Sequence, residues 1–265
     1  MLGHSLARLE AQADDAHRTA IRDLLEAERA RTIARVWGGH GFQLNIVHAT
    51  GIAGAREAHG VVVVIDVLRS FTVSAYALAG GARECRLVKT VAEARALAER
   101  TPGAVISAEE EALPVLGIPI SNSPTQVHKL DLTDRVLIQR STAGTQVAAA
   151  VKGEAIFAAS LVVARATVQA CLLRRPQTLT LIASADHPED HACASYMEAL
   201  ANNENADLDK LLQPLRQSDR YRRARSGQWP GFPSTDLDLS LKADVFDFAM
   251  PVTPAGDHLR LSAAG

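Results

Sequence analysis

The chain has 265 residues, of which 47% are hydrophobic and 22% are charged, a composition typical of a folded globular protein. Twenty-eight basic against thirty acidic side chains leave a net charge of −2, which argues against a nucleic-acid or membrane-surface partner. No stretch reaches the roughly 18 uninterrupted apolar residues of a membrane span, and the N-terminal segment shows no apolar signal region. Three widely spaced cysteines argue against a disulfide framework, so we expect a cytoplasmic protein without a membrane association.

Residues 6–36 carry a narrow apolar stripe at helical spacing between interleaved arginines and acids, which predicts one long charged helix. Such a helix either packs on the domain with its other faces in solvent or serves as an oligomerisation arm, so a homodimer is possible. Gly38, Gly39 and Gly41 then end the pattern. We therefore divide the chain into an N-terminal helical extension, residues 1–40, and an α/β domain, residues 41–265.

Strand and helix patterns alternate along this domain. Residues 61–65 are all apolar and β-branched, as in strands that helices cover on both faces of a sheet. Further strands are expected at residues 42–48, 86–88, 104–107, 135–139, 155–158, 178–183 and 246–252. A loop is expected at residues 51–60, and helices at residues 73–79, 91–100, 144–151, 164–174 and 191–201. The alternation predicts a three-layer α/β/α fold with a mostly parallel sheet.

One polar segment interrupts this alternation. Residues 203–238 are rich in arginine, glutamine, proline and serine, and no strand pattern runs through them. One reading is a helical excursion from the domain over residues 207–223. A mobile flap is the alternative reading of the same composition, and the sequence does not separate the two.

Polar residues that follow strands directly are the first candidates for a site, because open α/β sheets bind ligands at the carboxyl ends of their strands. Asp66 follows the strand at residues 61–65, where an acid is costly unless it is paired or holds a cation. Asp66 can bind Mg²⁺, which prefers hard oxygen ligands, and Arg69 can grip a phosphate through its planar fork. Alternatively, Asp66 and Arg69 form a structural ion pair, or Asp66 caps a helix.

A second candidate follows the strand at residues 135–139, where hydroxyls and a glycine open a helix. These residues are Ser141, Thr142, Gly144 and Thr145. Backbone N–H groups at such a position form a natural anion pocket. The spacing is not that of a Walker loop, and the hydroxyls can instead act only as helix caps.

Two further segments carry candidate residues. Glu189 and Asp190 precede the expected helix at residues 191–201, where they can serve as metal ligand or general base, or simply complement the helix dipole. Glu109 follows the strand at residues 104–107. Asn122 and Ser123 belong to a turn signature, and they contact a ligand only if their loop folds back over the strand ends.

These segments, in this order, resemble the 2-phosphosulfolactate phosphatase family, a Mg²⁺-dependent group. Residues 63–72, VVIDVLRSFT, match the family's V-I-D-V-L-R-A-x-T and carry the most specific part of the likeness. Residues 121–124 match G-N-S-P, residues 141–145 match a T-T-N-G-T type of loop, and residues 189–194 match E-D-x-x-C-A. The similarity spans residues 42–252 and leaves the N-terminal helix outside.

The chain departs from the family pattern at five positions. Ala108 and Glu110 replace the glycine and arginine of a G-E-R motif, Ser121 replaces a glycine, and Ala143 and Val163 replace asparagines. Losing polar and basic groups weakens the hold on a sulfonate-bearing dianion. The resemblance therefore implies the fold and a phosphate-ester site, with 2-phosphosulfolactate or a related phosphorylated metabolite as the substrate.

The reaction that the resemblance implies is Mg²⁺-assisted hydrolysis of a small phosphate monoester. Asp66 and Glu109 are expected to bind the metal, and Glu189 or Asp190 to orient or deprotonate the attacking water. The residues expected to hold the phosphate are Arg69, Asn122, Ser123, Ser141, Thr142, Gly144 and Thr145. Two alternatives remain: a catalytically silent relative that binds a phosphorylated metabolite, and a lyase or isomerase that anchors its substrate by phosphate.

Overall fold

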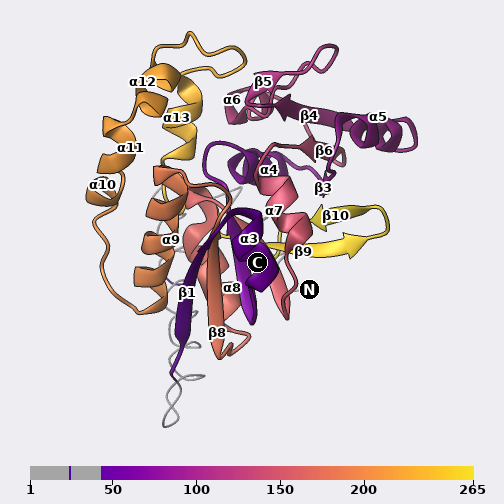
Figure 1. Cartoon of the computed structure of the whole chain (residues 1–265). Coiled ribbons are helices and arrows are strands. Elements are labelled where there is room, and N and C mark those ends of the chain that lie inside the picture. Colours follow the sequence, from indigo (N-terminus) through magenta and orange to yellow (C-terminus); the bar gives the residue numbers. More distant parts are fainter. Residues whose placement is uncertain (1–23, 25–42) are drawn as a thin grey trace.

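The computed structural model describes residue 24 and residues 43–265 of the chain (Figure 1). With the exception of Leu24, the predicted N-terminal helix and the extension of residues 1–40 lie outside the described residues. None of the helices in the described part combines the length and the apolar character needed to cross a bilayer.

The described residues alternate between strands and helices. The strands are β1 Asn45–Thr50, β2 Val61–Ile65, β3 Glu84–Leu87, β4 Val105–Glu110, β5 Leu113–Pro114, β6 Val136–Arg140, β7 Ala155–Ala159, β8 Thr178–Ala183, β9 Met250–Ala255 and β10 His258–Leu261. The helices are α3 Gly51–Glu57, α4 Ser70–Ala79, α5 Val91–Glu99, α6 Pro124–Val127, α7 Gly144–Ala150, η1 Leu161–Val163, α8 Ala164–Leu172, α9 Pro188–Ala201, α10 Leu208–Leu211, α11 Gln213–Gln217, α12 Asp219–Arg225 and α13 Thr235–Ser240. Helices lie on both sides of the sheet, which confirms the predicted α/β fold.

The sheet has ten strands in the order β1-β8-β2-β7-β9-β10-β3-β6-β4-β5. It consists of two parallel blocks, β1-β8-β2-β7 and β3-β6-β4, which the antiparallel hairpin β9–β10 joins (Figure 1). Five of the nine strand pairs among the described residues are parallel. The two-block arrangement matters for function, because it brings the carboxyl ends of strands from both blocks together.

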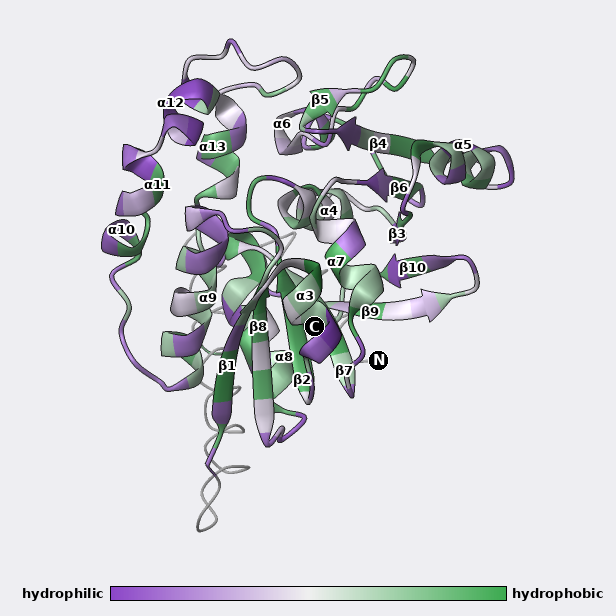
Figure 2. Cartoon of the chain, viewed as in Figure 1, coloured by the Kyte–Doolittle hydropathy of each residue, from purple (hydrophilic) through white to green (hydrophobic). Residues whose placement is uncertain are grey.

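Strand β2 lies at the centre of the first block, between β8 and β7, and all five of its residues are buried. Its β-branched side chains pack against helices on both faces, as the continuous apolar pattern predicts. Helices α3 and α7 pack together on one side of the block, and α8 and α9 pack together on the other. Figure 2 shows the hydrophobic strands β2 and β7 inside this block.

Helix α4 connects the first block to the second and is buried from Ser70 to Leu78. It packs against β3 and β6 of one block and β7 of the other, and against α6 and α7. A helix with apolar or small residues all round suits such a central position. Its buried N-terminus lies next to Asp66 and so becomes part of the site.

Three local expectations need correction. The loop expected at residues 51–60 contains helix α3; Gly54 is a helix residue whose missing side chain allows close approach to Ala49. Helix α9 begins at Pro188 rather than at residue 191, because proline is well tolerated in the first turn of a helix. The strand expected at residues 246–252 begins only at Met250, as β9, and it continues into a hairpin with β10 that turns at Gly256 with a φ of 72°.

The polar segment of residues 203–238 forms a helical excursion, one of the two structures expected for it, although with several short helices rather than one. It folds into the short helices α10, α11 and α12 and continues into α13, and prolines and serines interrupt the helical runs. Trp229 and Phe232 of this segment are buried. The segment therefore packs on the domain and, as shown below, supplies part of the site.

Candidate active site

A cavity of about 210 Å³ lies where the carboxyl ends of the two parallel blocks meet. Six residues singled out from the sequence line it: Asp66, Arg69, Glu109, Asn122, Ser141 and Thr142. The other five are buried close by without lining the cavity: Ser123, Gly144, Thr145, Glu189 and Asp190. The expectation that residues after different strands converge is therefore met for segments that lie far apart in the sequence.

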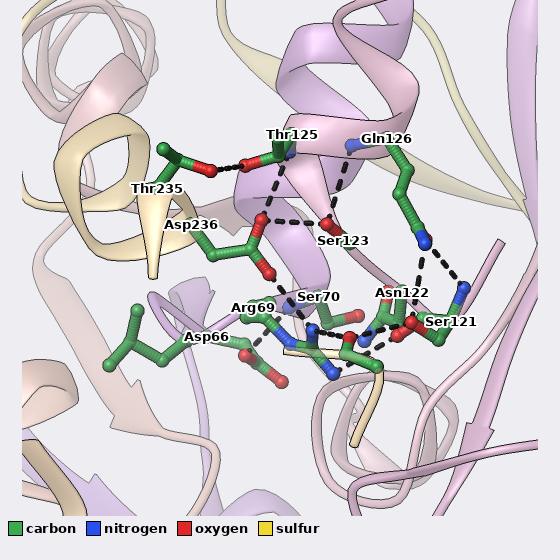
Figure 3. Close-up of polar contacts among 12 residues, drawn as sticks. Asp66, Arg69, Ser70, Ser121, Asn122, Ser123, Thr125, Gln126, Thr235 and Asp236 are labelled. Carbon is green, nitrogen blue, oxygen red and sulfur yellow. Dashed lines mark hydrogen bonds and ion pairs between the residues drawn. The ribbon is translucent and has the colours of Figure 1, made fainter. Parts of the chain in front are cut away.

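Asp66 is 5% exposed and is held by two backbone amides. Its Oδ1 accepts a hydrogen bond of 2.9 Å from the amide of Ser70, at the start of α4 (Figure 3). Its Oδ2 accepts a hydrogen bond of 2.9 Å from the amide of Gly144. Burial raises the pKa of Asp66 to about 6, and the nearby Glu109 adds to the rise, against the hydrogen bonds and the charge of Arg220. A bound cation would stabilise the ionised form of this carboxylate.

Gly144 has no room for a side chain. A Cβ at this position would lie 2.5 Å from Oδ2 of Asp66 and 3.1 Å from Cβ of Ser70. The glycine therefore allows the start of α7 to approach the carboxylate closely enough to donate its amide. The predicted role of Gly144 in phosphate binding stays a prediction, and its amide is engaged by Asp66.

Arg69 is 4% exposed and forms its ion pair with Asp236, over 2.9 Å, rather than with Asp66. Its guanidinium also donates to the carbonyl oxygens of Gly231, over 2.6 Å, and Ser121, over 3.0 Å. Figure 3 shows Arg69 between Asp236 and Ser121, and its guanidinium lies 4.3 Å from the centre of the Phe232 ring. The Asp66–Arg69 ion pair considered from the sequence is therefore wrong.

Glu109, at the end of β4, binds the loop that follows β6. Its Oε1 accepts a hydrogen bond of 2.5 Å from the Thr142 amide, and its Oε2 accepts one of 3.0 Å from the Thr142 hydroxyl. The amide of Ala112 also donates to Oε2, and Arg140 donates to the Glu109 carbonyl. Two amides of the predicted anion loop, at residues 142 and 144, thus hold carboxylates of the protein itself.

The remaining loop residues bind one another. Ser141 accepts a hydrogen bond of 3.1 Å from the amide of Thr145, and the Thr145 hydroxyl donates to the Ser141 carbonyl over 2.8 Å. Both side chains are buried, but Ser141 also lines the cavity. The pairing orders the loop before α7, but the N-cap of this helix is Ala143 and no side chain caps it, so the capping role considered from the sequence is wrong. Ser141 and Thr142 are the hydroxyl residues of this loop at the cavity wall.

The Asn122 and Ser123 loop folds back over the strand ends. Asn122 has a φ of 58°, lines the cavity, and its Oδ1 accepts a hydrogen bond of 2.7 Å from Gln139. Ser123 caps α6 and donates to Oδ1 of Asp236 over 2.7 Å (Figure 3). Asn122 is therefore placed to meet a ligand, whereas Ser123 holds the loop against α13.

Glu189 and Asp190 lie in the first turn of α9, buried behind the cavity wall. Oδ1 of Asp190 accepts from the Val67 amide over 2.8 Å, and its Oδ2 accepts from the Ser184 hydroxyl over 2.9 Å. Burial, together with the charges of Asp66 and Glu189, raises the pKa of Asp190 well above its ordinary value. Because Ser184 lines the cavity, Asp190 reaches the cavity through this hydroxyl.

Other residues of the cavity were not expected from the sequence. They include Glu111, Ser184 and His187, of which the last two follow β8, and Arg220, Trp229 and Phe232 of the polar segment. Ser184 directly follows a strand, so the rule that found Asp66 also points to it. No local pattern in residues 203–238 marks Arg220, or Asp236, which is the buried partner of Arg69. The roles of both residues depend on contacts with residues more than 30 positions away.

The carboxylates of the cavity suit a magnesium ion that a substrate helps to bind. In the described part of the chain, no group of three or more His, Cys, Asp or Glu side chains is placed to hold a metal ion. Mg²⁺, however, is usually bound through one or two carboxylates, water and substrate phosphates. Asp66 and Glu109 both line the cavity and their charges repel, so these two residues fit that mode of binding.

The comparison with known families agrees with the geometry. The model of the 2-phosphosulpholactate phosphatase family matches residues 48–248, a range that includes every residue of the site. The chain belongs to this family. A probable 2-phosphosulfolactate phosphatase of Bacillus subtilis (strain 168) is 32% identical over 202 residues, 74% of this chain and 88% of the relative.

Two further relatives carry the same description. The protein of Thermotoga petrophila is 36% identical over 107 residues, 40% of this chain and 46% of the relative. The protein of Deinococcus radiodurans is 30% identical over 201 residues, 71% of this chain and 82% of the relative. The resemblance inferred from the motifs is therefore confirmed.

Proposed function

We propose that the protein hydrolyses a small phosphate monoester, 2-phosphosulfolactate or a related phosphorylated metabolite, with the help of Mg²⁺. The observation that supports this most is the cavity itself: in a chain of this family, six candidate residues from both parallel blocks line one cavity of about 210 Å³. The relatives named above are described as probable 2-phosphosulfolactate phosphatases.

In this proposal, Asp66 and Glu109 would hold the metal, and Mg²⁺ would then polarise the phosphoryl oxygens and lower the pKa of a bound water. Backbone amides fix both carboxylates, so their positions do not depend on the ligand. Asn122, Ser141 and Thr142 line the same cavity, where they would orient the ester with the hydrogen-bonding capacity that their contacts with Gln139, Thr145 and Glu109 leave open. Positioning of this kind accounts for much of the rate gain in phosphoryl transfer.

We assign the orientation of the attacking water to the pair formed by Ser184 and Asp190. The hydroxyl of Ser184 donates to the buried carboxylate, so its oxygen lone pairs remain available to accept a hydrogen bond from a water in the cavity. The raised pKa of Asp190 makes this carboxylate a stronger base than an exposed aspartate. Asp190 thus acts through Ser184. Of the two residues expected from the sequence to orient or deprotonate the water, Glu189 and Asp190, we assign this role to Asp190.

The departures from the family pattern leave the substrate open within this class. Glu110 is exposed at the end of β4, where the family motif carries a basic residue. Ser121 is built into the site wall, since its hydroxyl donates to the Gly231 carbonyl over 2.6 Å and its own carbonyl accepts from Arg69. A related ester without a sulfonate remains part of the proposal for this reason.

The proposal is tested by phosphate release from a panel of phosphate esters that includes 2-phosphosulfolactate, with Mg²⁺ and with a chelator. We expect release from at least one ester, and we expect the chelator to abolish it. Absence of release from every ester, together with tight phosphate binding, would favour the catalytically silent relative. Conversion of a phosphorylated compound without release of phosphate would favour the lyase or isomerase.

A cytoplasmic location is also part of the proposal. Cys85, Cys171 and Cys193 are all free and buried, as expected for a chain that folds in a reducing compartment. The homodimer stays a prediction from the sequence.

A further inference from the structure

Three residues that carry, or can acquire, positive charge line the cavity: Arg69, His187 and Arg220. Arg69 already pairs with Asp236 and donates to two carbonyl oxygens, so most of its hydrogen-bonding capacity is used. Burial lowers the pKa of His187, and the charge of Arg220 lowers it further, so the imidazole is neutral at pH 7. Arg220 is the remaining cation of the cavity wall.

Arg220 is held along one edge of its guanidinium and is open along the other. Its Nε donates to Oε1 of Glu189 over 2.8 Å, and its Nη2 donates to the Leu68 carbonyl over 3.0 Å. A guanidinium carries five N–H donors, so three of them have no partner among the described residues. The side chain is 22% exposed, enough for these donors to reach the cavity that it lines.

Glu189 explains why Arg220 has a defined position. The carboxylate is fully buried, pairs with Arg220 through Oε1, and has no hydrogen-bond partner for Oε2 among the described residues. A buried charge of this kind is costly and persists only with its counter-ion. Glu189 comes from α9 and Arg220 from α12, so the ion pair connects the polar segment to the domain.

The charge of the cavity favours such a cation. Asp66, Glu109 and Glu111 also line the cavity, and a phosphate ester would bring further negative charge to the same place. Arg220 is close enough to Asp66 to lower its pKa, which places its charge beside the expected metal site. A planar guanidinium with free donors is the side chain best suited to two parallel hydrogen bonds with phosphate oxygens.

We propose that Arg220 binds the phosphoryl group of the substrate, and that Glu189 is its positioning residue. The inference rests on the proposed function only in taking a phosphate ester as the ligand. It assigns the phosphate contact expected of Arg69 to an arginine from the polar segment. Arg69 instead joins the loop of Ser121 to α13 through Asp236.

The test measures the binding of inorganic phosphate to the full chain, in the presence of Mg²⁺, by titration calorimetry. Arg220→Gln removes the guanidinium but leaves Glu189 buried without its partner, so the double variant Arg220→Gln/Glu189→Gln is made beside it. Arg222→Gln is the matched control, because Arg222 lies on the same helix but pairs with Asp219 in solvent, outside the cavity. Melting curves establish that each variant is folded.

We expect Arg220→Gln and the double variant Arg220→Gln/Glu189→Gln to bind phosphate at least about tenfold more weakly than the control. This is the loss of affinity expected when a charge-assisted contact is removed. Arg220→Lys should recover only part of the affinity, because an ammonium cannot keep the Glu189 contact and form two parallel bonds to phosphate. Glu189→Gln alone should raise KM more than it lowers kcat. In a chain that already carries Arg220→Gln, the added substitution Glu189→Gln should have no further effect on phosphate binding.

Phosphate binding by the double variant that equals that of Arg222→Gln would overturn the proposal. If the wild-type chain bound phosphate through Arg220 but released none from any ester, the proposed hydrolysis would fail while this assignment stood. If the double variant hydrolysed the ester normally, with unchanged KM, the proposed hydrolysis would stand and the assignment of Arg220 would fail. A wild-type chain that binds no phosphate at all would overturn both.

Discussion

Gly144→Ala tests whether the position of the Asp66 carboxylate matters, without changing any side chain that can react. The new Cβ would lie 2.5 Å from Oδ2 of Asp66 and 3.1 Å from Cβ of Ser70, far inside ordinary contact. The carboxylate has little freedom to retreat, because the amides of Ser70 and Gly144 hold its two oxygens. The substitution therefore pushes the carboxylate out of place and stretches its hydrogen bond to α7.

The size of the effect follows from these contacts. Overpacking a buried position costs about 1–3 kcal/mol, and weakening a hydrogen bond to a charged group costs about 1.5–3 kcal/mol. Alanine recovers up to about 1 kcal/mol as the better helix former. We expect the free energy of unfolding to fall by about 2–4 kcal/mol, and kcat/KM to fall about a hundredfold, as for a group misplaced by an ångström.

The assay combines urea denaturation with phosphate-release kinetics at a temperature where the variant is folded. Gly54→Ala is the matched control, because its Cβ would lie 2.8 Å from Cβ of Ala49, and neither residue lines the cavity. We expect the control to lose stability and keep its kcat/KM. A folded Gly144→Ala protein with wild-type turnover would refute the view that Asp66 must be held in place.

Three further outcomes are expected. The pKa of Asp66 is about 6 in the folded chain against 3.8 ordinarily, so the folded state binds the proton more tightly. The contribution of Asp66 to stability is therefore fully present below pH 4 and is lost as the pH rises through 6. In the metal-free protein the loss from Asp66 alone should reach about 3 kcal/mol. Asp66→Asn should therefore flatten the dependence of the free energy of unfolding on pH, measured by denaturation in a chelator, and an unchanged dependence would contradict this account. Arg69→Lys should lower the free energy of unfolding by about 2–3 kcal/mol, because lysine cannot keep the contacts with Asp236 and two carbonyl oxygens. An unaffected melting curve would show that these bonds are dispensable. Ser184→Ala should lower kcat and leave phosphate affinity unchanged, since Asp190 would lose its route to the cavity; equal loss of both, or of neither, would argue against the relay.

The parts of the site that could be predicted from the sequence are those that local pattern determines. Five β-branched residues define β2 as a buried strand, and the acid that follows it must then lie at a ligand-binding edge. The same rule applied to β6 and β4 identified Ser141, Thr142 and Glu109, all of which line the cavity. Strand ends are predictable because strand periodicity and the position of polar residues after it are both local properties.

The parts that could not be predicted depend on contacts between distant segments. The hairpin β9–β10 joins two parallel blocks, so the site lies between blocks rather than along one sheet edge. Arg69 lines the cavity, but its ion-pair partner Asp236 is 167 residues away and no local pattern points to it. Arg220 lies in a polar segment with no strand pattern, and its meaning becomes visible only when α12 packs against Glu189.

A crystal structure of the full chain with Mg²⁺ and inorganic phosphate tests most directly whether the cavity where the two parallel blocks meet binds a metal ion and a phosphate group. We expect the metal to be bound by Asp66 and Glu109, and the phosphate to lie within hydrogen-bond distance of Arg220 and Thr142. A metal bound to neither carboxylate, or a phosphate bound outside this cavity, would contradict the proposed site.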